Sequence, residues 1–245
     1  IEQFIFVTGR NKSVIEDHFD KQVELEATLR ARGKKDELDL LDQILPLPGT
    51  TSFTRQQEPL GLGHAVWCAR DLIGNEPFAL LLPDVVVQAP GKGCLAQMLE
   101  VYNTHGGNVL AVEQVPAEET SKYGVVSIAD EAGGSRLKGR CWALDGMVEK
   151  PKQNPPSNLT ILGRYILQPE IMAILQNQER GAGGEIQLTD AMLRLMQTQS
   201  FFGLEYEGRS FDCGSKIGFL AANVALALSR PDLGPQLRAE IARLL

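Results

Sequence analysis

The sequence contains few of the side chains that usually build a nucleophilic or a metal–thiolate site. It has four cysteines and three histidines in 245 residues, and no two cysteines follow the C-x-x-C spacing. A zinc site or a disulfide framework is therefore not expected, and reduced thiols in a cytoplasm fit best. The G-x-S-x-G elbow of hydrolases and the G-x-x-x-x-G-K-S/T phosphate loop are absent as well.

Long apolar runs and an excess of basic residues are also missing. No run approaches the roughly 18 apolar residues of a membrane helix, so no membrane association is expected. The formal net charge is -7 and the pI is about 5.1, which argues against a nucleic-acid partner because phosphate backbones attract basic surfaces. The length is sufficient for a large core, and we expect a single domain over residues 1–245.

Short apolar runs alternate with segments of helical spacing. Runs at residues 4–8, 78–87 and 108–112 predict buried strands, and helical segments stand between them. This order predicts an α/β fold with a mixed, mostly parallel sheet flanked by helices. More polar strands near residues 123–128 and 141–144 predict an antiparallel subregion.

Two further segments are expected to be helical. Residues 21–45 are rich in charge and carry leucines at helical spacing, which predicts a helical insert with a solvated face. Residues 230–245 predict a C-terminal helix. The sequence opens in an apolar run without an initiator methionine, so we expect residues upstream of Ile1.

The stretch Phe78 to Val87 reads F-A-L-L-L-P-D-V-V-V and places Asp84 at the end of an apolar run. In open α/β sheets, ligands bind at the carboxyl ends of the strands. A carboxylate beside so much hydrocarbon is costly unless a positive group meets it. Asp84 is therefore either a ligand for a divalent metal that carries a nucleotide phosphate, or the start of a simple turn.

Two later motifs offer more charged candidates. In M-V-E-K-P, residues 147–151, Glu149 suits sugar hydroxyls and Lys150 suits a phosphate, with their side chains diverging; the alternative is an exposed strand end. In F-D-C-G-S-K, residues 211–216, Asp212 is a second oxygen ligand of the kind Mg²⁺ prefers, or it forms an Asx turn or helix cap.

Glycines precede two predicted helices. Gly61 and Gly63 in G-L-G-H-A would let backbone approach a ligand closely, although a plain tight turn is the commoner cause. The glycines of residues 181–190, G-A-G-G-E-I-Q-L-T-D, have the same two interpretations, a backbone that approaches a ligand or a flexible turn. Glu185 is a weaker functional candidate in this segment.

Taken in order, the motifs resemble one family over about residues 1–230. They are R-Q, G-L-G-H-A, L-L-P-D, Y-G-V-V, M-V-E-K-P, G-R-Y-I-L, G-E-I-Q-L-T-D and F-D-C-G-S-K. Their order and spacing resemble the bacterial UTP–glucose-1-phosphate uridylyltransferases, a branch of the sugar nucleotidyltransferases. The resemblance implies a Rossmann-like nucleotide-diphospho-sugar transferase fold.

The resemblance also implies roles for residues at the nucleotide. Gln56 and Gly61 would contact the uracil ring. Asp84 would bind Mg²⁺, and Asp212 would complete or assist that metal site. The family further implies assembly as a homodimer or homotetramer.

At the sugar phosphate, the resemblance implies that Gly124 and Glu149 hold the glucose hydroxyls and that Lys150 meets the phosphate. The reaction implied is displacement at the α-phosphorus of UTP by glucose 1-phosphate, giving UDP-glucose and pyrophosphate. Such chemistry needs positioning and charge neutralisation rather than a covalent nucleophile. Alternatives are a thymidylyl- or cytidylyltransferase acting on a sugar 1-phosphate, and a non-catalytic relative that binds a UDP-sugar.

One departure from the family concerns the start of the sequence. Family members begin with a first strand and a G-x-G-T-R loop that grips the triphosphate, and no stretch of this sequence matches that loop. Ile1 falls where the family's second strand begins. Either this sequence omits the first strand and its glycine-rich loop, as we expect, or the chain itself is truncated there.

Overall fold

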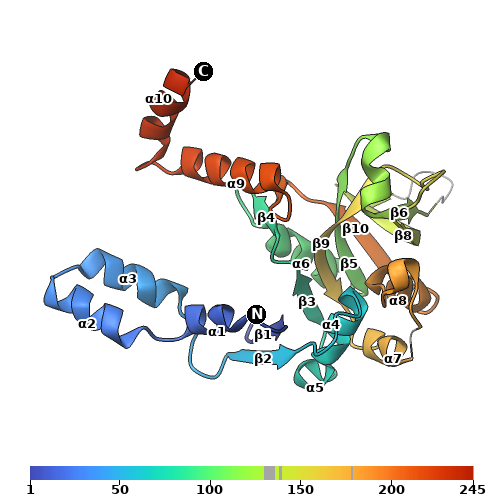
Figure 1. Cartoon of the computed structure of the whole chain (residues 1–245). Coiled ribbons are helices and arrows are strands. Elements are labelled where there is room, and N and C mark those ends of the chain that lie inside the picture. The colour runs from blue at the N-terminus through green and yellow to red at the C-terminus, as the bar shows by residue number, and fades with distance from the viewer. Residues whose placement is uncertain (130–135, 138–139, 178, 245) are drawn as a thin grey trace. The chain divides into compact units, whose positions relative to one another are not determined.

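The computed structural model describes residues 1–129, 136–137, 140–177 and 179–244. The chain divides into two compact units. Figure 1 labels the helices and strands of the chain. The first unit comprises Ile1–Gly74 and Leu175–Leu188, and the second comprises Asn75–Ile174 and Thr189–Leu245.

The first unit is built on a pair of parallel strands, β1 (Phe4–Thr8) and β2 (Thr51–Arg55). Phe6 faces Phe53 across this pair, with ring centroids 5.1 Å apart, and also contacts Phe19 at 4.8 Å. The helices between and after the strands are α1 (Ser13–Phe19), α2 (Val23–Ala31), α3 (Lys35–Ile44), α4 (Leu62–Cys68) and α5 (Arg70–Ile73).

The segment predicted to be helical, residues 21–45, holds α2 and α3. Their charges pair locally, as in Lys34 with Glu37 at 2.8 Å and Lys35 with Asp39 at 2.7 Å, and these side chains are exposed. Exposed pairs of this kind contribute little to stability, which fits a solvated face.

The second unit contains a seven-stranded sheet with the order β10-β5-β9-β6-β8-β7, in which β3 also pairs with β9 and β10 also pairs with β8. The strands are β3 (Phe78–Leu81), β5 (Asn108–Gln114), β6 (Gly124–Ile128), β7 (Arg136–Leu137), β8 (Cys141–Glu149), β9 (Leu159–Leu167) and β10 (Phe201–Glu205). A separate antiparallel pair joins β4 (Val85–Gln88) to β11 (Arg209–Asp212).

The α/β class and the mixed sheet are confirmed, and the antiparallel subregion is the pairing of β6, β7 and β8. Strand direction needs a correction. Only β1–β2 and β5–β10 pair in parallel among the described residues, so the sheet is not mostly parallel. Polar alternation fails to indicate strand direction here because it is removed by burial. Strand β9 is almost wholly buried and shows no polar alternation, although its neighbours run antiparallel to it.

The stretch at residues 78–87 is not one strand buried on both faces. It divides at Leu82–Asp84 into β3, which pairs with β9, and β4, which pairs with β11. Its strand residues are half-buried, and Leu81 is 45% exposed. Pro83 lacks an N–H group for a strand partner, so the chain turns there and leaves Asp84 at the end of β3, as predicted.

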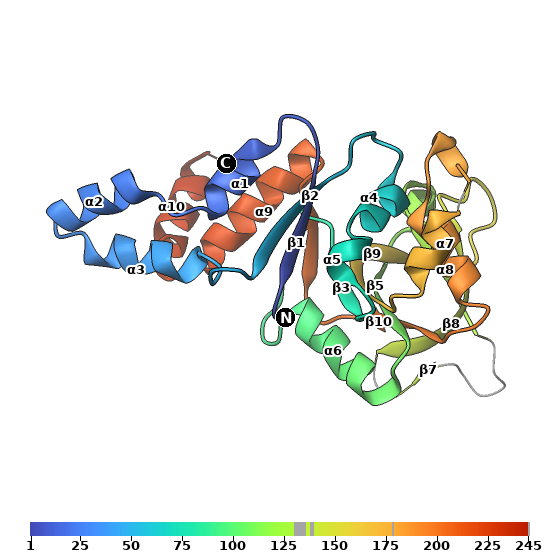
Figure 2. The ribbon, with the colours of Figure 1, turned by 90° about the horizontal axis from the view of Figure 1, so that it is seen from below.

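Helices of the second unit cover the sheet. Helix α6 (Cys94–His105) packs over β5, β9 and β10 (Figure 2), and its buried Met98 shares a core cluster with Val109, Ile166 and Leu204. The other helical segments of the chain are η1 (Ala117–Lys122), α7 (Ile171–Gln176), η2 (Ala182–Gly184), α8 (Leu188–Leu195), α9 (Lys216–Ser229) and α10 (Gly234–Leu244).

Two observations concern the whole chain. Within the described part, no helix has both the length and the apolar character required to cross a membrane. The helix predicted at residues 230–245 overlaps α10, and Leu245 lies outside the described residues.

Candidate active site

Two carboxylates from distant parts of the sequence meet in the second unit. Asp84 directly precedes β4, and Asp212 ends β11, so the antiparallel pairing of these strands brings the two residues to the same end. A β-carbon placed on Gly214 would lie 3.0 Å from Asp212 Oδ1 and 3.3 Å from Asp84 Oδ2. Both oxygens therefore face one point, and only hydrogen fills the side-chain position there.

The turn after β11 fixes this arrangement. Cys213 N–H donates to the carbonyl of Asp84 at 2.7 Å, and Gly214 N–H donates to Asp212 Oδ1 at 2.9 Å. Asp212 thus forms an Asx turn while its carboxylate also faces Asp84. Ser215, not Asp212, caps α9, because its Oγ accepts from Gly218 N–H at 3.0 Å.

Arg164 on β9 holds the loop that carries Asp84, and sequence reasoning did not single it out. Its guanidinium donates to the carbonyl of Leu82 at 2.7 Å and to the carbonyl of Val85, which bracket Pro83 and Asp84. Burial lowers the pKa of Arg164, and the negative charge of Asp84 opposes that effect. The only earlier signal was the G-R-Y-I-L motif, whose role the resemblance did not define.

Gly124 and Glu149 face each other across the pairing of β6 and β8. A β-carbon on Gly124 would lie 3.2 Å from Glu149 Oε2, so a larger residue would crowd the carboxylate. Thr189, on α8, donates its hydroxyl to the same oxygen at 2.6 Å. The Glu149 side chain is only 14% exposed, and its carboxylate is thus held in one orientation by Thr189, which sequence analysis did not single out.

Lys150 lies beside Glu149 in a left-handed backbone conformation, with φ at 47°. Its N–H donates to the carbonyl of Tyr123, and its Nζ lies 3.6 Å from Glu149 Oε1. The expected divergence of the two side chains is therefore not observed, because the turn at Lys150 brings the ammonium back toward the carboxylate. The Lys150 side chain is 58% exposed, so it remains accessible to a phosphate.

The buried phenol of Tyr165 connects these groups electrostatically. Burial raises the pKa of Tyr165, and the negative charges of Glu149 and Asp84 raise it further. Both carboxylates therefore act on the same ring, from β8 and from the loop after β3.

In the first unit, Gln56 and Gly61 are in direct contact. Gln56 Nε2 donates to the carbonyl of Gly61 at 3.0 Å and lies 3.1 Å from His64 Nδ1. Gly61 has φ at 108°, and a β-carbon there would lie 2.8 Å from both Glu185 Cβ and the carbonyl of Ile186. Glycine is thus required on both counts, because the G-E-I segment packs against the G-L-G turn.

The cysteines are free thiols and do not suit nucleophilic catalysis. Burial raises the pKa of Cys94 and of Cys141 to about 11, which leaves both protonated near neutral pH. Cys213 lies between Asp212 and Gly214 in the turn described above, where its N–H holds Asp84.

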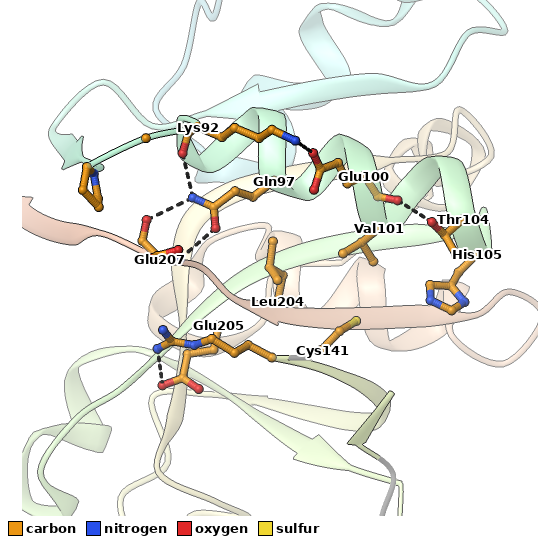
Figure 3. A pocket seen from close by; sticks show the side chains of 13 residues that line it. Lys92, Gln97, Glu100, Val101, Thr104, His105, Cys141, Leu204, Glu205 and Glu207 are labelled. Atoms are coloured by element: carbon orange, nitrogen blue, oxygen red, sulfur yellow. Dashed lines mark hydrogen bonds and ion pairs between the residues drawn. The ribbon is translucent and has the colours of Figure 1, made fainter. Parts of the chain in front are cut away.

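A cavity of about 650 Å³ lies beside α6 and β10, away from the predicted site residues (Figure 3). Its charged side chains pair among themselves: Lys92 with Glu100, and Arg140 with Glu205 at 3.2 Å. Gln97 spans its rim, donating to the carbonyls of Lys92 and Glu207. The charges of these four side chains are therefore already compensated, and the carboxylates that converge at Gly214 are the better candidates for chemistry.

Comparisons with known proteins show the family to which the chain belongs. A family model described as "Nucleotidyl transferase" matches residues 2–227. The chain is 44% identical to a UTP–glucose-1-phosphate uridylyltransferase of Bacillus subtilis, over 97% of the chain and 79% of that protein. It is 46% identical to a protein of the same name from Komagataeibacter xylinus, over 89% of the chain and 74% of that protein.

A solved structure gives the same result. A UDP-glucose pyrophosphorylase from Acinetobacter baumannii, which has also been solved with UTP bound, matches with a TM-score of 0.88 and 40% identity. The match covers 100% of this chain and 84% of that one. The chain therefore belongs to the nucleotidyl transferase family, in the branch of the UTP–glucose-1-phosphate uridylyltransferases.

Proposed function

We propose that the protein transfers a uridylyl group from UTP to glucose 1-phosphate, releasing pyrophosphate and forming UDP-glucose. The observation that carries this proposal is the convergence of Asp84 and Asp212 beside Gly214. In a chain of this family, paired carboxylates suit the binding of a nucleotide phosphate through a divalent metal.

The residues present fit Mg²⁺. Carboxylate oxygens are the hard ligands that Mg²⁺ prefers, and Asp84 Oδ2 and Asp212 Oδ1 face one point. No group of three or more histidine, cysteine, aspartate or glutamate side chains suited to a metal occurs in the described part of the chain. Two carboxylates are sufficient, because Mg²⁺ commonly keeps waters and takes substrate phosphate oxygens as its other ligands. When bound, Mg²⁺ would neutralise charge on the phosphates.

The protein groups would act mainly by orienting the two substrates. A phosphate oxygen of glucose 1-phosphate would attack the α-phosphorus of UTP while the bond to pyrophosphate breaks. Lys150, whose ammonium is exposed, would meet the phosphate of the sugar phosphate. Glu149, held by Thr189 and backed by Gly124, would accept hydrogen bonds from glucose hydroxyls.

The uracil ring would lie against Gln56 and Gly61, which offer polar groups at the turn after β2. We further infer that the protein is cytoplasmic and that, as the resemblance implies, it forms a homodimer or a homotetramer. Light scattering of the purified protein would measure the oligomer.

Pyrophosphate release with glucose 1-phosphate as acceptor tests the function, with UTP, dTTP and CTP as alternative donors. We expect release with UTP to exceed release with dTTP or CTP and to require Mg²⁺. A preference for dTTP or CTP would instead assign a thymidylyl- or cytidylyltransferase. Tight binding of UDP-glucose without turnover would indicate a non-catalytic relative.

Asp84→Asn tests the metal role. The variant keeps the size of the side chain but loses the charge, so we expect turnover to fall at least about 100-fold with the fold unchanged by circular dichroism. Asp42→Asn is the matched control, because Asp42 is exposed on α3 and forms no ion pair within the described residues. Near-normal turnover of Asp84→Asn would contradict the metal role.

A further inference from the structure

The contacts of Gln56 fix which way its amide points. A carbonyl oxygen can only accept, so the Gly61 carbonyl requires the Nε2 end of the amide at 3.0 Å. Nε2 carries two hydrogens, and the second points to His64 Nδ1 at 3.1 Å. With both hydrogens engaged, Oε1 is the end of the amide that remains for a ligand, and it has no partner among the described residues.

This orientation distinguishes between pyrimidine bases. Uracil presents a carbonyl oxygen at position 4 beside an N3–H donor, whereas cytosine presents an amino donor beside an N3 acceptor. Gln56 Oε1 would accept from the N3–H of uracil and would face a lone pair in cytosine. Gly61 N–H, which has no partner within the described residues, would supply the donor that the uracil carbonyl needs.

His64 has the geometry to hold the amide in this state. Its Nδ1 can accept from Gln56 only when the ring is neutral with its proton on Nε2, and Nε2 lies 3.9 Å from Cys68 Sγ, a weak acceptor one helical turn along α4. The imidazole stacks on Trp67, with centroids 6.0 Å apart, and the Arg70 guanidinium covers the indole at 3.7 Å. Trp67 at the end of α4, covered by Arg70 at the start of α5, thus fixes the position of the ring.

We propose that His64 is a positioning residue for base selection, which locks the Gln56 amide so that uracil is accepted and cytosine is rejected. The inference rests on the proposed uridylyl transfer and adds to it the group that sets the choice of base. The inference also predicts that His64 does not discriminate between uracil and thymine. Thymine presents the same carbonyl and N3–H edge as uracil, so the oriented Gln56 amide does not reject dTTP.

The test measures the equilibrium binding of UTP, CTP and dTTP by calorimetry. It compares the purified wild-type protein with two variants at His64. His64→Phe keeps a ring beside Trp67 but removes the acceptor, and His64→Asn keeps an acceptor near the position of Nδ1. We expect His64→Phe to reduce the UTP-to-CTP affinity ratio about three- to tenfold, the scale of one neutral hydrogen bond, while the UTP-to-dTTP ratio is unchanged. His64→Asn should retain the wild-type UTP-to-CTP ratio within about twofold.

A double-mutant cycle isolates the coupling to Gln56. In a Gln56→Ala background, His64→Phe should no longer change the UTP-to-CTP ratio, because the amide it orients is gone. Equal weakening of all three nucleotides by both His64 variants would indicate a purely structural role and overturn the inference. A wild-type protein that binds UTP over CTP but releases no pyrophosphate would contradict the proposed function alone, because these binding ratios do not depend on turnover.

Discussion

At the scale of single residues, the sequence indicated candidate side chains for contact with the substrates but not the residues that orient those candidates. Asp84, Glu149 and Asp212 stand in short motifs with local signals, such as Pro83 before Asp84. Arg164 and Thr189 act on partners 82 and 40 positions away, and no local spacing encodes such a contact. Residues of this second kind can be recognised only once the strands are paired.

Arg164 gives a prediction at this scale. Arg164→Ala removes the donors to the carbonyls of Leu82 and Val85, so we expect unfolding free energy to fall by about 1–3 kcal/mol and kcat by about tenfold or more. Arg164→Lys should be intermediate, because one ammonium is a poor substitute for a planar fork that reaches two carbonyls. Urea titration and steady-state rates measure both effects.

The matched control for Arg164 is Arg243→Ala on α10, where the side chain is 77% exposed and pairs with nearby Glu240. This variant should match the wild type in stability and rate, because exposed ion pairs contribute little. Wild-type turnover by Arg164→Ala would show that the loop keeps Asp84 in place without the guanidinium.

At the scale of elements, periodicity located most strands and helices but not strand direction. The strand predicted at residues 4–8 has those bounds, and the predicted run at 108–112 lies within β5. The predicted strand direction was wrong where β5 pairs antiparallel with β9, because full burial removes polar alternation from an antiparallel strand as thoroughly as from a parallel one. The stretch at 78–87 failed in another way, since its two halves pair with different partners, β9 and β11.

The junction of β11 and α9 gives the element-scale prediction. A β-carbon on Gly218 would overlap the carbonyl of Asp212, a backbone atom that cannot swing aside. Gly218→Ala should therefore move the turn that carries Asp212, lower unfolding free energy by about 1–3 kcal/mol and weaken Mg²⁺-dependent turnover. Thermal unfolding and steady-state rates check the two effects together.

Gly91→Ala is the control for that substitution, because a β-carbon on Gly91 meets nothing within 4 Å and its φ is not positive. It should leave stability and turnover near the wild-type values. If Gly218→Ala behaved like this control, the turn between β11 and α9 would have to be more adaptable than its hydrogen bonds suggest.

At the scale of the whole molecule, the order of weak motifs carried more information than any one of them. Each motif alone had a plain structural explanation, yet their sequence along the chain indicated the family that the comparisons now show. Amino-acid composition mainly argued against classes of site and partner, such as zinc sites and nucleic-acid partners. The division into two units was not predicted, because the first unit is completed by Leu175–Leu188, a segment far from the rest of that unit in sequence.

We propose that the two units nevertheless unfold as a single domain. The chain passes between them three times, and two of these crossings fall inside α7 and α8, whose backbone hydrogen bonds would break if either unit unfolded alone.

The only two tryptophans provide reporters, since Trp67 belongs to the first unit and Trp142 to the second. Trp142→Phe leaves fluorescence from the first unit, and Trp67→Phe leaves fluorescence from the second. We expect each variant's urea midpoint by fluorescence to coincide with its own midpoint by far-ultraviolet circular dichroism. Midpoints that separate between the two probes, in opposite directions in the two variants, would show that each unit is a domain in its own right.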